Sequence, residues 1–306
     1  MLNSLRLSGN LGEVVIVDGG LTPPQRAQLA GVATVVDQPS EVAGTHPIAV
    51  KPSVYLLEPE GVVVLVDSDM IVTRPLDDLV DRARGGQIVA FPDHRSKHDR
   101  WFAEWEELFE LNAPPRHQLY VNAGLVALSV ERRPAFLERW HRAVARIPPE
   151  RIQQDPSDAV WAADQDALNA ILMSEVLPED VWVGPEWESI HPDGLSDVAI
   201  TDERTLACRY RGKPTTLLHF SLYPKPWQSK AWRRITRDNA FVRLMPRLLY
   251  GDDVPVRPED AKLPFWARDG AGASTAARML GVTVSAGYGA KRAGLRLRAA
   301  LRRRLA

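Results

Sequence analysis

Two carboxylates separated by one residue follow a strongly apolar stretch in the sequence GVVVLVDSDMIV at positions 61–72. In an extended chain the side chains of Asp67 and Asp69 point to the same side, where their negative charges repel each other. A divalent cation relieves this repulsion, and hard oxygen ligands suit Mg²⁺ or Mn²⁺, which completes its shell with water and substrate phosphates. The pair therefore predicts a metal site. The alternative is that Asp69 only begins a turn ahead of the next helix.

A second polar stretch, LLHFSLYPKPW at 217–227, offers groups that would complement such a metal. His219 falls near the end of a predicted strand and supplies an imidazole nitrogen, which Mn²⁺ accepts readily. Lys225 lies between two prolines in a stiff loop and is a point charge suited to a diphosphate. Alternatively, the histidine packs in the core and the lysine is solvated.

A predicted helix at 157–175 places further polar groups on an apolar face. Its apolar stripe consists of Trp161, Leu168, Ile171 and Leu172. Asp164 falls on this stripe, Gln165 borders it, and Asp166 is expected to point away. A carboxylate and an amide that face inward at a helix start indicate a polar site beneath them. Alternatively, Asp164 is a first-turn acid that the helix dipole favours.

The sequence YVNAGLVAL at 120–128 combines a polar side chain with small residues. Asn122 offers both a donor and an acceptor, and Ala123 with Gly124 lets a ligand approach the backbone closely. Taken alone, this stretch is equally a strand entry with a glycine kink.

The segments that must position these residues alternate between two kinds. Predicted strands cover 13–20, 61–66, 124–130 and 215–220, and predicted helices cover 22–31, 74–83, 133–147 and 157–175. This alternation indicates an α/β fold with a mixed, mostly parallel sheet flanked by helices. In such sheets ligands bind outside the carboxyl ends of the strands. The two carboxylates directly follow 61–66, which reads as a fully buried strand, so they are expected where a substrate would lie.

The composition is that of a soluble globular protein. The chain has 306 residues, of which 45% are hydrophobic and 25% charged, and its net charge of −1 leaves no electrostatic footprint for nucleic acid. The single cysteine, Cys208, cannot form an internal disulfide. No apolar run approaches the roughly 18 residues that a membrane span needs. We therefore expect a cytoplasmic protein.

Four stretches, VDSDM, VNAGLV, ADQDALN and HFSLYPKPW, occur in this order between residues 66 and 227. As an ordered set they resemble glycosyltransferase family 8, a retaining family that includes glycogenin and bacterial lipopolysaccharide glycosyltransferases. The resemblance implies a GT-A (Rossmann-like) fold, a nucleotide-sugar donor that is typically UDP-linked, and Mn²⁺ (or Mg²⁺) as cofactor. The acceptor would be a carbohydrate or a lipid-linked hydroxyl.

The resemblance also implies roles for single residues. The metal ligands would be Asp67, Asp69 and His219. The residues around the donor would be Lys51, Asp93, Asn122, Ala123, Gly124, Asp164 and Lys225. Of these, Lys225 would contact the diphosphate, Asn122 and Asp164 would hold the sugar, and Gln165 would lie near the anomeric carbon. Lys51 occupies the place where the family often has an arginine at the nucleotide.

These roles predict how the reaction would proceed. Negative charge develops on the departing nucleoside diphosphate, and a metal ion with Lys225 would neutralise it. On the sugar's other face Gln165 would be the nearest group, and an amide is a poor nucleophile. We therefore expect a front-face mechanism, in which the departing phosphate deprotonates the acceptor.

The sequence departs from the family pattern in two places. Leu222 stands where the family usually has a glycine whose backbone meets the diphosphate. The family's first strand and nucleotide-binding loop have no counterpart ahead of MLNSLRLSG, for which a shortened gene model is the expected reason. The alternative function is a non-catalytic, GT-A-shaped binding or scaffold protein.

The resemblance ends near residue 250, which predicts a transferase domain at 1–250 and a C-terminal extension at 251–306. The tail at 290–306 carries seven basic residues and no acid. This pattern fits a basic amphipathic helix on an anionic membrane, at the inner face, and equally a solvated helix. Acceptor recognition is expected at 94–118, with Trp187 and Glu188 as weaker candidates.

Overall fold

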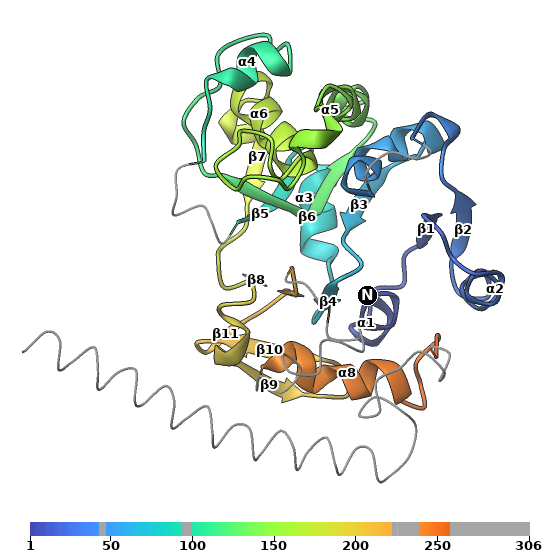
Figure 1. The fold of residues 1–306 in the computed structure, drawn as a ribbon. Coiled ribbons are helices and arrows are strands. Elements are labelled where there is room, and N and C mark those ends of the chain that lie inside the picture. The colour runs from blue at the N-terminus through green and yellow to red at the C-terminus, as the bar shows by residue number, and fades with distance from the viewer. Residues whose placement is uncertain (43–46, 94–99, 222–224, 226–238, 258–306) are drawn as a thin grey trace, which may run out of the picture. The chain divides into compact units, whose positions relative to one another are not determined.

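The computed structural model describes residues 1–42, 47–93, 100–221, 225 and 239–257 (Figure 1). The chain forms two compact units. One consists of Met1–Gly9, Ile71–Arg74 and Ile190–Ala306, and the other consists of Asn10–Met70 and Pro75–Ser189. Both contain helices and strands, so the expected mixed α/β class is confirmed. The predicted tail at 290–306 and Leu222 lie outside the described residues. In the part of the chain that is described, no helix is long and apolar enough to cross a membrane.

The larger unit, Asn10–Met70 with Pro75–Ser189, is built on a four-stranded mixed sheet with the order β3-β6-β5-β7. Its strands are β3 (Val62–Val66), β5 (Ile88–Pro92), β6 (Val121–Ser129) and β7 (Val181–Val183). β6 runs antiparallel to β3 and β5, whereas β5 and β7 are parallel, so three of the strands share one direction. All residues of β6 are buried, as its apolar and small side chains require.

Helices cover this sheet and close its core. They are α3 (Asp77–Arg84), α4 (Glu104–Leu108), α5 (Phe136–Ala145), α6 (Asp164–Glu175) and the 3₁₀ helices η1 (Ser40–Val42), η2 (Pro47–Leu57), η4 (Pro149–Arg151) and η5 (Pro178–Asp180). Figure 1 shows α4, α5 and α6 close together beside the strands. The fully buried indoles of Trp105 and Trp140 belong to one core with β6 and α6. The indole of Trp140 also donates a hydrogen bond of 2.7 Å to the carbonyl of Asp164, which joins α5 to the start of α6.

The start of α6 differs from the sequence prediction. The helix begins at Asp164, seven residues later than expected, and Trp161 lies in a turn before it. Ala163 at its N-cap has φ 39° and ψ −95°, a conformation that residues other than glycine rarely adopt. Asp166 was expected to point away from the core, but it is fully buried. The prediction was wrong because α6 is buried from Asp164 to Ser174, so an amphipathic period does not describe it.

β3 is less buried than its sequence predicts. Only Leu65 in β3 is buried, and its valines are half-buried. Among the described residues, β3 pairs with one strand only, β6. In the same part of the chain, β1 (Val15–Asp18) pairs only with β2 (Thr34–Asp37), and the two strands are parallel. The short helix α2 (Pro23–Ala30) connects β1 and β2 and buries no residue.

The described part of the other unit contains two three-stranded sheets, two α-helices and one 3₁₀ turn. The sheets have the orders β4-β12-β8 and β11-β10-β9. Their strands are β4 (Met70–Val72), β8 (Ser189–Ile190), β9 (Val198–Asp202), β10 (Ala207–Tyr210), β11 (Lys213–Pro214) and β12 (Leu217–His219), and the helices are α1 (Leu2–Leu7), the 3₁₀ turn η6 (Leu195–Asp197) and α8 (Ala240–Tyr250). Phe241 and Leu244 of α8 share a core with Leu218 of β12. This packing holds the strand that ends in His219.

A buried asparagine on α6 joins the helix to β6. The Nδ2 of Asn169 donates to the carbonyls of Val121 (2.8 Å) and Gln165 (2.7 Å), and its Oδ1 accepts from the amide of Val121 at 2.7 Å. Replacing Asn169→Leu keeps the branched shape but leaves the Val121 backbone groups without these partners. We expect a loss of about 2–4 kcal/mol in the free energy of unfolding, measured by urea denaturation.

The control for this variant is Asn112→Leu, the same substitution at an exposed position. It should change stability by less than about 0.5 kcal/mol. Equal stability of the two variants would show that the Asn169 bonds do not fasten the helix.

Candidate functional site

A partly buried lysine, with a side chain 17% exposed, joins three segments of the larger unit. The Nζ of Lys51, on η2, lies 2.6 Å from Oδ1 of Asp67 and 3.2 Å from Oδ2 of Asp164, and it donates to the carbonyl of Ala123 at 2.8 Å. These partners follow β3, begin α6 and belong to β6. The side chain of Asp164 is only 9% exposed, whereas that of Asp67 is 30% exposed. One cation thus holds a buried and a partly accessible carboxylate together.

The charges of this group shift their pKa values. Burial by itself lowers the pKa of Lys51, but the charges of Asp67 and Asp164 outweigh it and raise the pKa above its ordinary value. Burial raises the pKa of Asp164 to about 6, with Lys51 lowering it and Asp67 raising it further. Lys51 therefore stays cationic at neutral pH, and ionisation of Asp164 costs free energy in the folded protein.

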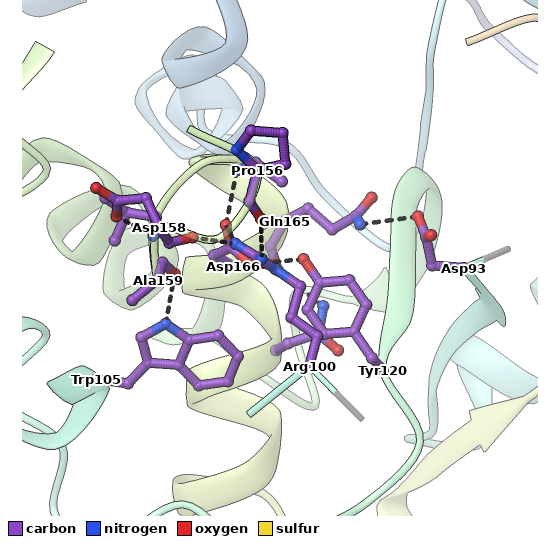
Figure 2. Close-up of polar contacts among 12 residues, drawn as sticks. Asp93, Arg100, Trp105, Tyr120, Pro156, Asp158, Ala159, Gln165 and Asp166 are labelled. Atoms are coloured by element: carbon purple, nitrogen blue, oxygen red, sulfur yellow. Dashed lines mark hydrogen bonds and ion pairs between the residues drawn. The ribbon is translucent and has the colours of Figure 1, made fainter. Parts of the chain in front are cut away.

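An amide network lies beside the lysine. Oε1 of Gln165 accepts from Nδ2 of Asn122 (2.9 Å) and from the amide of Ala123 (3.1 Å). Nε2 of Gln165 donates to Oδ2 of Asp93 at 2.9 Å, and Nδ2 of Asn122 donates to the same oxygen at 2.9 Å. Figure 2 shows Gln165 reaching Asp93 from α6. Both ends of the Gln165 amide are therefore fixed.

The backbone of β6 sets this geometry. The register between β5 and β6 shifts between Ala90 and Phe91, after which Phe91 faces Asn122. The Oδ1 of Asn122 accepts from the amide of Gly124 at 2.8 Å, and the carbonyl of Gly124 accepts from the amide of Asp67 at 2.8 Å. The end of β3 is thus fastened to the same short stretch of β6.

The larger unit brings together most of the residues that the sequence predicted. They are Lys51, Asp67, Asp93, Asn122, Ala123, Gly124, Asp164 and Gln165. Asp69 lies two residues after Asp67, in the turn between β3 and β4. Asp67 and Asp93 directly follow strands and Asp164 begins α6, whereas Asn122 to Gly124 lie within β6 and Lys51 lies within η2.

Two predicted residues belong to the other unit. His219 is the last residue of β12 and is 4% exposed, and its ring lies 5.3 Å from the ring of His191, centroid to centroid. Lys225 is also buried, and its Nζ donates to the carbonyl of Phe220 at 2.9 Å. The alternative of a solvated lysine is therefore wrong. An imidazole and two carboxylates form a nitrogen and oxygen donor set that fits Mn²⁺.

Sequence reasoning missed the partners of Asp166. Arg100 and Tyr120 both contact this carboxylate, and Arg100 was not singled out in the sequence. The second acid of ADQDALN was the available signal, because an acid that is buried in a helix needs a cation. Nothing in the local pattern pointed to residue 100 as its source.

Comparison with known proteins yields no family model and no curated protein that matches this chain. Among solved structures, the glycosyltransferase GlyE of Streptococcus pneumoniae TIGR4 is 14% identical with a TM-score of 0.42, and the match covers 79% of this chain. This chain spans 58% of the length of GlyE.

Two further solved structures are similar to this chain. Mouse xyloside xylosyltransferase 1 in its apo form is 15% identical with a TM-score of 0.40, over 68% of this chain and 84% of its own. A glycosyltransferase involved in the glycosylation of the major capsid of PBCV-1 is 12% identical with a TM-score of 0.34, over 69% of this chain and 95% of its own.

The ion pairs of Lys51 make a stability prediction. Lys51→Met leaves Asp67 and Asp164 beside an apolar side chain, and removing one partner of a buried pair costs about 3–5 kcal/mol. We expect a loss of that order in the free energy of unfolding, measured by urea denaturation at pH 7.5 with a chelator present. Lys213→Met, at an exposed position, is the control and should have little effect. Equal stability of the two variants would contradict the bridging role.

The raised pKa of Asp164 makes a prediction about pH. The unfolded chain has the ordinary value of 3.8 and the folded protein about 6, so between these values the folded protein binds more protons. Its free energy of unfolding therefore falls as pH rises from about 4 to about 6. Relative to Asp164→Asn, the wild type should lose about 3 kcal/mol over this window. The measurement is chemical denaturation at each pH with a chelator present.

The control is Asp78→Asn, which removes an exposed acid at the start of α3. Its stability should follow the wild type through the same pH range. Parallel curves for wild type and Asp164→Asn would show that Asp164 ionises as it does in the unfolded chain.

Proposed function

We propose that this protein is a metal-dependent, retaining glycosyltransferase that moves a hexose from a UDP-linked donor to a carbohydrate or lipid-linked hydroxyl. The observation that carries the proposal is the polar cluster in the larger unit, where Lys51 joins Asp67 to Asp164 and Gln165 joins Asn122 to Asp93. Groups with strongly shifted pKa values that gather beside a partly accessible carboxylate are typical of functional sites. The ordered motifs, which resemble family 8 with its GT-A fold, support the same proposal, and the proposed setting is a bacterial cytoplasm.

The proposed metal ligands are Asp67, Asp69 and His219, and the proposed ion is Mn²⁺. Chain connectivity supports this set, because Asp69 directly precedes β4, β4 pairs with β12, and His219 ends β12. When bound, the metal would neutralise charge on the diphosphate. Lys225 would contribute a second positive charge from its buried position.

The sugar would meet the network of Asp164, Asn122 and Asp93, whose oxygens accept bonds from hydroxyl groups. Ala123 and Gly124 bring the β6 backbone close to the same place, since neither carries a large side chain. Lys51 is a cation with a strongly raised pKa, so it offers a fixed positive charge to a phosphate or to the sugar. These residues would bind and orient the donor.

The geometry of Gln165 supports a front-face mechanism. Its amide is held at both ends, by Asn122 and Ala123 at the oxygen and by Asp93 at the nitrogen. The neighbouring carboxylate, Asp166, is fully buried and accepts bonds from protein donors at both oxygens. Neither group is suited to attack the anomeric carbon, so the departing phosphate would take the proton of the acceptor hydroxyl.

Binding of UDP tests the donor site. Calorimetric titration should show UDP binding with Mn²⁺ that is lost when a chelator replaces the metal. The double variant Asp67→Asn, Asp69→Asn should weaken this binding by more than about tenfold, which corresponds to about 1.4 kcal/mol. The control, Asp77→Asn with Asp78→Asn, changes two exposed acids and should bind UDP normally. Absence of Mn²⁺-dependent binding in the wild type would favour a scaffold protein.

Intact-protein mass spectrometry tests the mechanism. After incubation with a UDP-sugar and Mn²⁺, neither the wild type nor Gln165→Ala should carry a covalently attached hexose, because neither Gln165 nor Asp166 is suited to attack the anomeric carbon. A stable mass increase of one hexose in Gln165→Ala would overturn the front-face proposal.

A further inference from the structure

Asp166 is a fully buried carboxylate with four donors around it. Its Oδ1 lies 2.6 Å from Nε of Arg100 and accepts from the hydroxyl of Tyr120 at 2.7 Å. Its Oδ2 accepts from a second guanidinium nitrogen of Arg100 at 2.7 Å and from the amide of Ala162 at 2.7 Å. Figure 2 shows this arrangement at the start of α6. The arginine forms a planar, two-point pair with the carboxylate, which fixes orientation as well as distance.

Arg100 also holds the turns that lead into α6. Its guanidinium donates to the carbonyls of Asp158 (2.7 Å) and Pro156 (3.2 Å), while the Arg100 side chain is only 8% exposed. The same stretch ends at Ala163, whose positive φ is unfavourable for a residue with a Cβ. Such a conformation persists only when the surroundings over-determine it. The bonds of Arg100 and of the Ala162 amide provide that constraint.

The fixed turn carries the residues of the proposed sugar site. Asp164 and Gln165 directly precede Asp166, in the first turn of α6. Strand β6 and the residue before it bond this turn in order, since Tyr120 donates to Asp166 and Asn122 donates to Gln165. A movement that breaks one of these contacts displaces the others, because all are attached to one helical turn.

We propose that Arg100 is a positioning residue, whose pair with Asp166 holds the first turn of α6 so that Asp164 and Gln165 meet the donor sugar in reactive geometry. The inference rests on the proposed function. The guanidinium of Arg100 bonds Asp166 and the carbonyls of Pro156 and Asp158, so it would act on the sugar site through Asp166 and the turns before the helix. Misplacement of a reacting group by about 1 Å costs on the order of 100-fold in rate.

A second ion pair on α6 provides a matched control for an effect on protein stability alone. At its other end, Arg139 makes a two-point pair with Glu175, at 2.6 Å and 2.9 Å, and its guanidinium also donates to the carbonyl of Phe109 at 3.0 Å. The side chains of this pair are 18% and 12% exposed. Arg139→Met therefore removes a comparable partly buried pair from α6 without touching its first turn.

The kinetic test compares three variants in UDP-sugar hydrolysis with Mn²⁺. Arg100→Met should lower kcat by about 10- to 100-fold while the donor KM changes less than about threefold, because the group it misplaces acts at the reacting centre. Arg100→Lys keeps the charge but not the planar pair, so it should restore kcat only in part. Arg139→Met should leave kcat within about threefold of the wild type. Equal kcat losses in Arg100→Met and Arg139→Met would overturn the inference.

Amide hydrogen exchange tests the same inference without activity. In Arg100→Met, peptides that cover 158–168 should exchange at least about tenfold faster than in Arg139→Met, since the first turn has lost its constraint. Equal exchange in the two variants would overturn the inference whether or not the wild type turns over donor. A wild type that hydrolyses no UDP-sugar would overturn the proposed function, and the exchange comparison would still decide the role of Arg100.

Discussion

The larger unit depends on one electrostatic constraint, the burial of two carboxylates in the first turn of α6. Asp164 and Asp166 are both buried, and a buried charge is tolerated only when it is paired and hydrogen-bonded. Each receives its own cation from a different part of the chain, Lys51 for Asp164 and Arg100 for Asp166. The two pairs therefore tie η2 and the segment before α4 to the start of one helix.

Lys51 and Arg100 differ in chemistry, and the difference indicates that the first belongs to a ligand site and the second stabilises the fold around it. Lys51 is a compact charge that reaches Asp67, Asp164 and a backbone carbonyl at once, and one of these partners is partly exposed. Such a cation can change partners when a ligand enters. Arg100 is a planar donor that bonds both oxygens of Asp166, and this carboxylate has no exposed surface. The first arrangement suits binding, and the second suits fixed geometry.

Sequence reasoning succeeded where local pattern carries the information. The apolar run before Asp67 predicted a strand end, and ADQDALN predicted an inward-facing acid and amide, because strand ends and helix starts follow from short-range signals. It failed for Asp166, since a helix that is buried on every side has no polar face for the period to identify. It failed for Arg100 because an ion pair between residues 66 positions apart produces no local sequence pattern around either residue.

The residue type at position 165 follows from the charges around it. The Nε2 of Gln165 lies 2.9 Å from a carboxylate oxygen of Asp93, while its Oε1 accepts from Asn122 and the amide of Ala123. A glutamate here would keep the accepted bonds but place a second negative oxygen against Asp93, in a setting where like charges are costly. An amide satisfies both neighbours because it donates at one end and accepts at the other. The same requirement that makes residue 165 neutral removes the nucleophile that a double-displacement reaction would need.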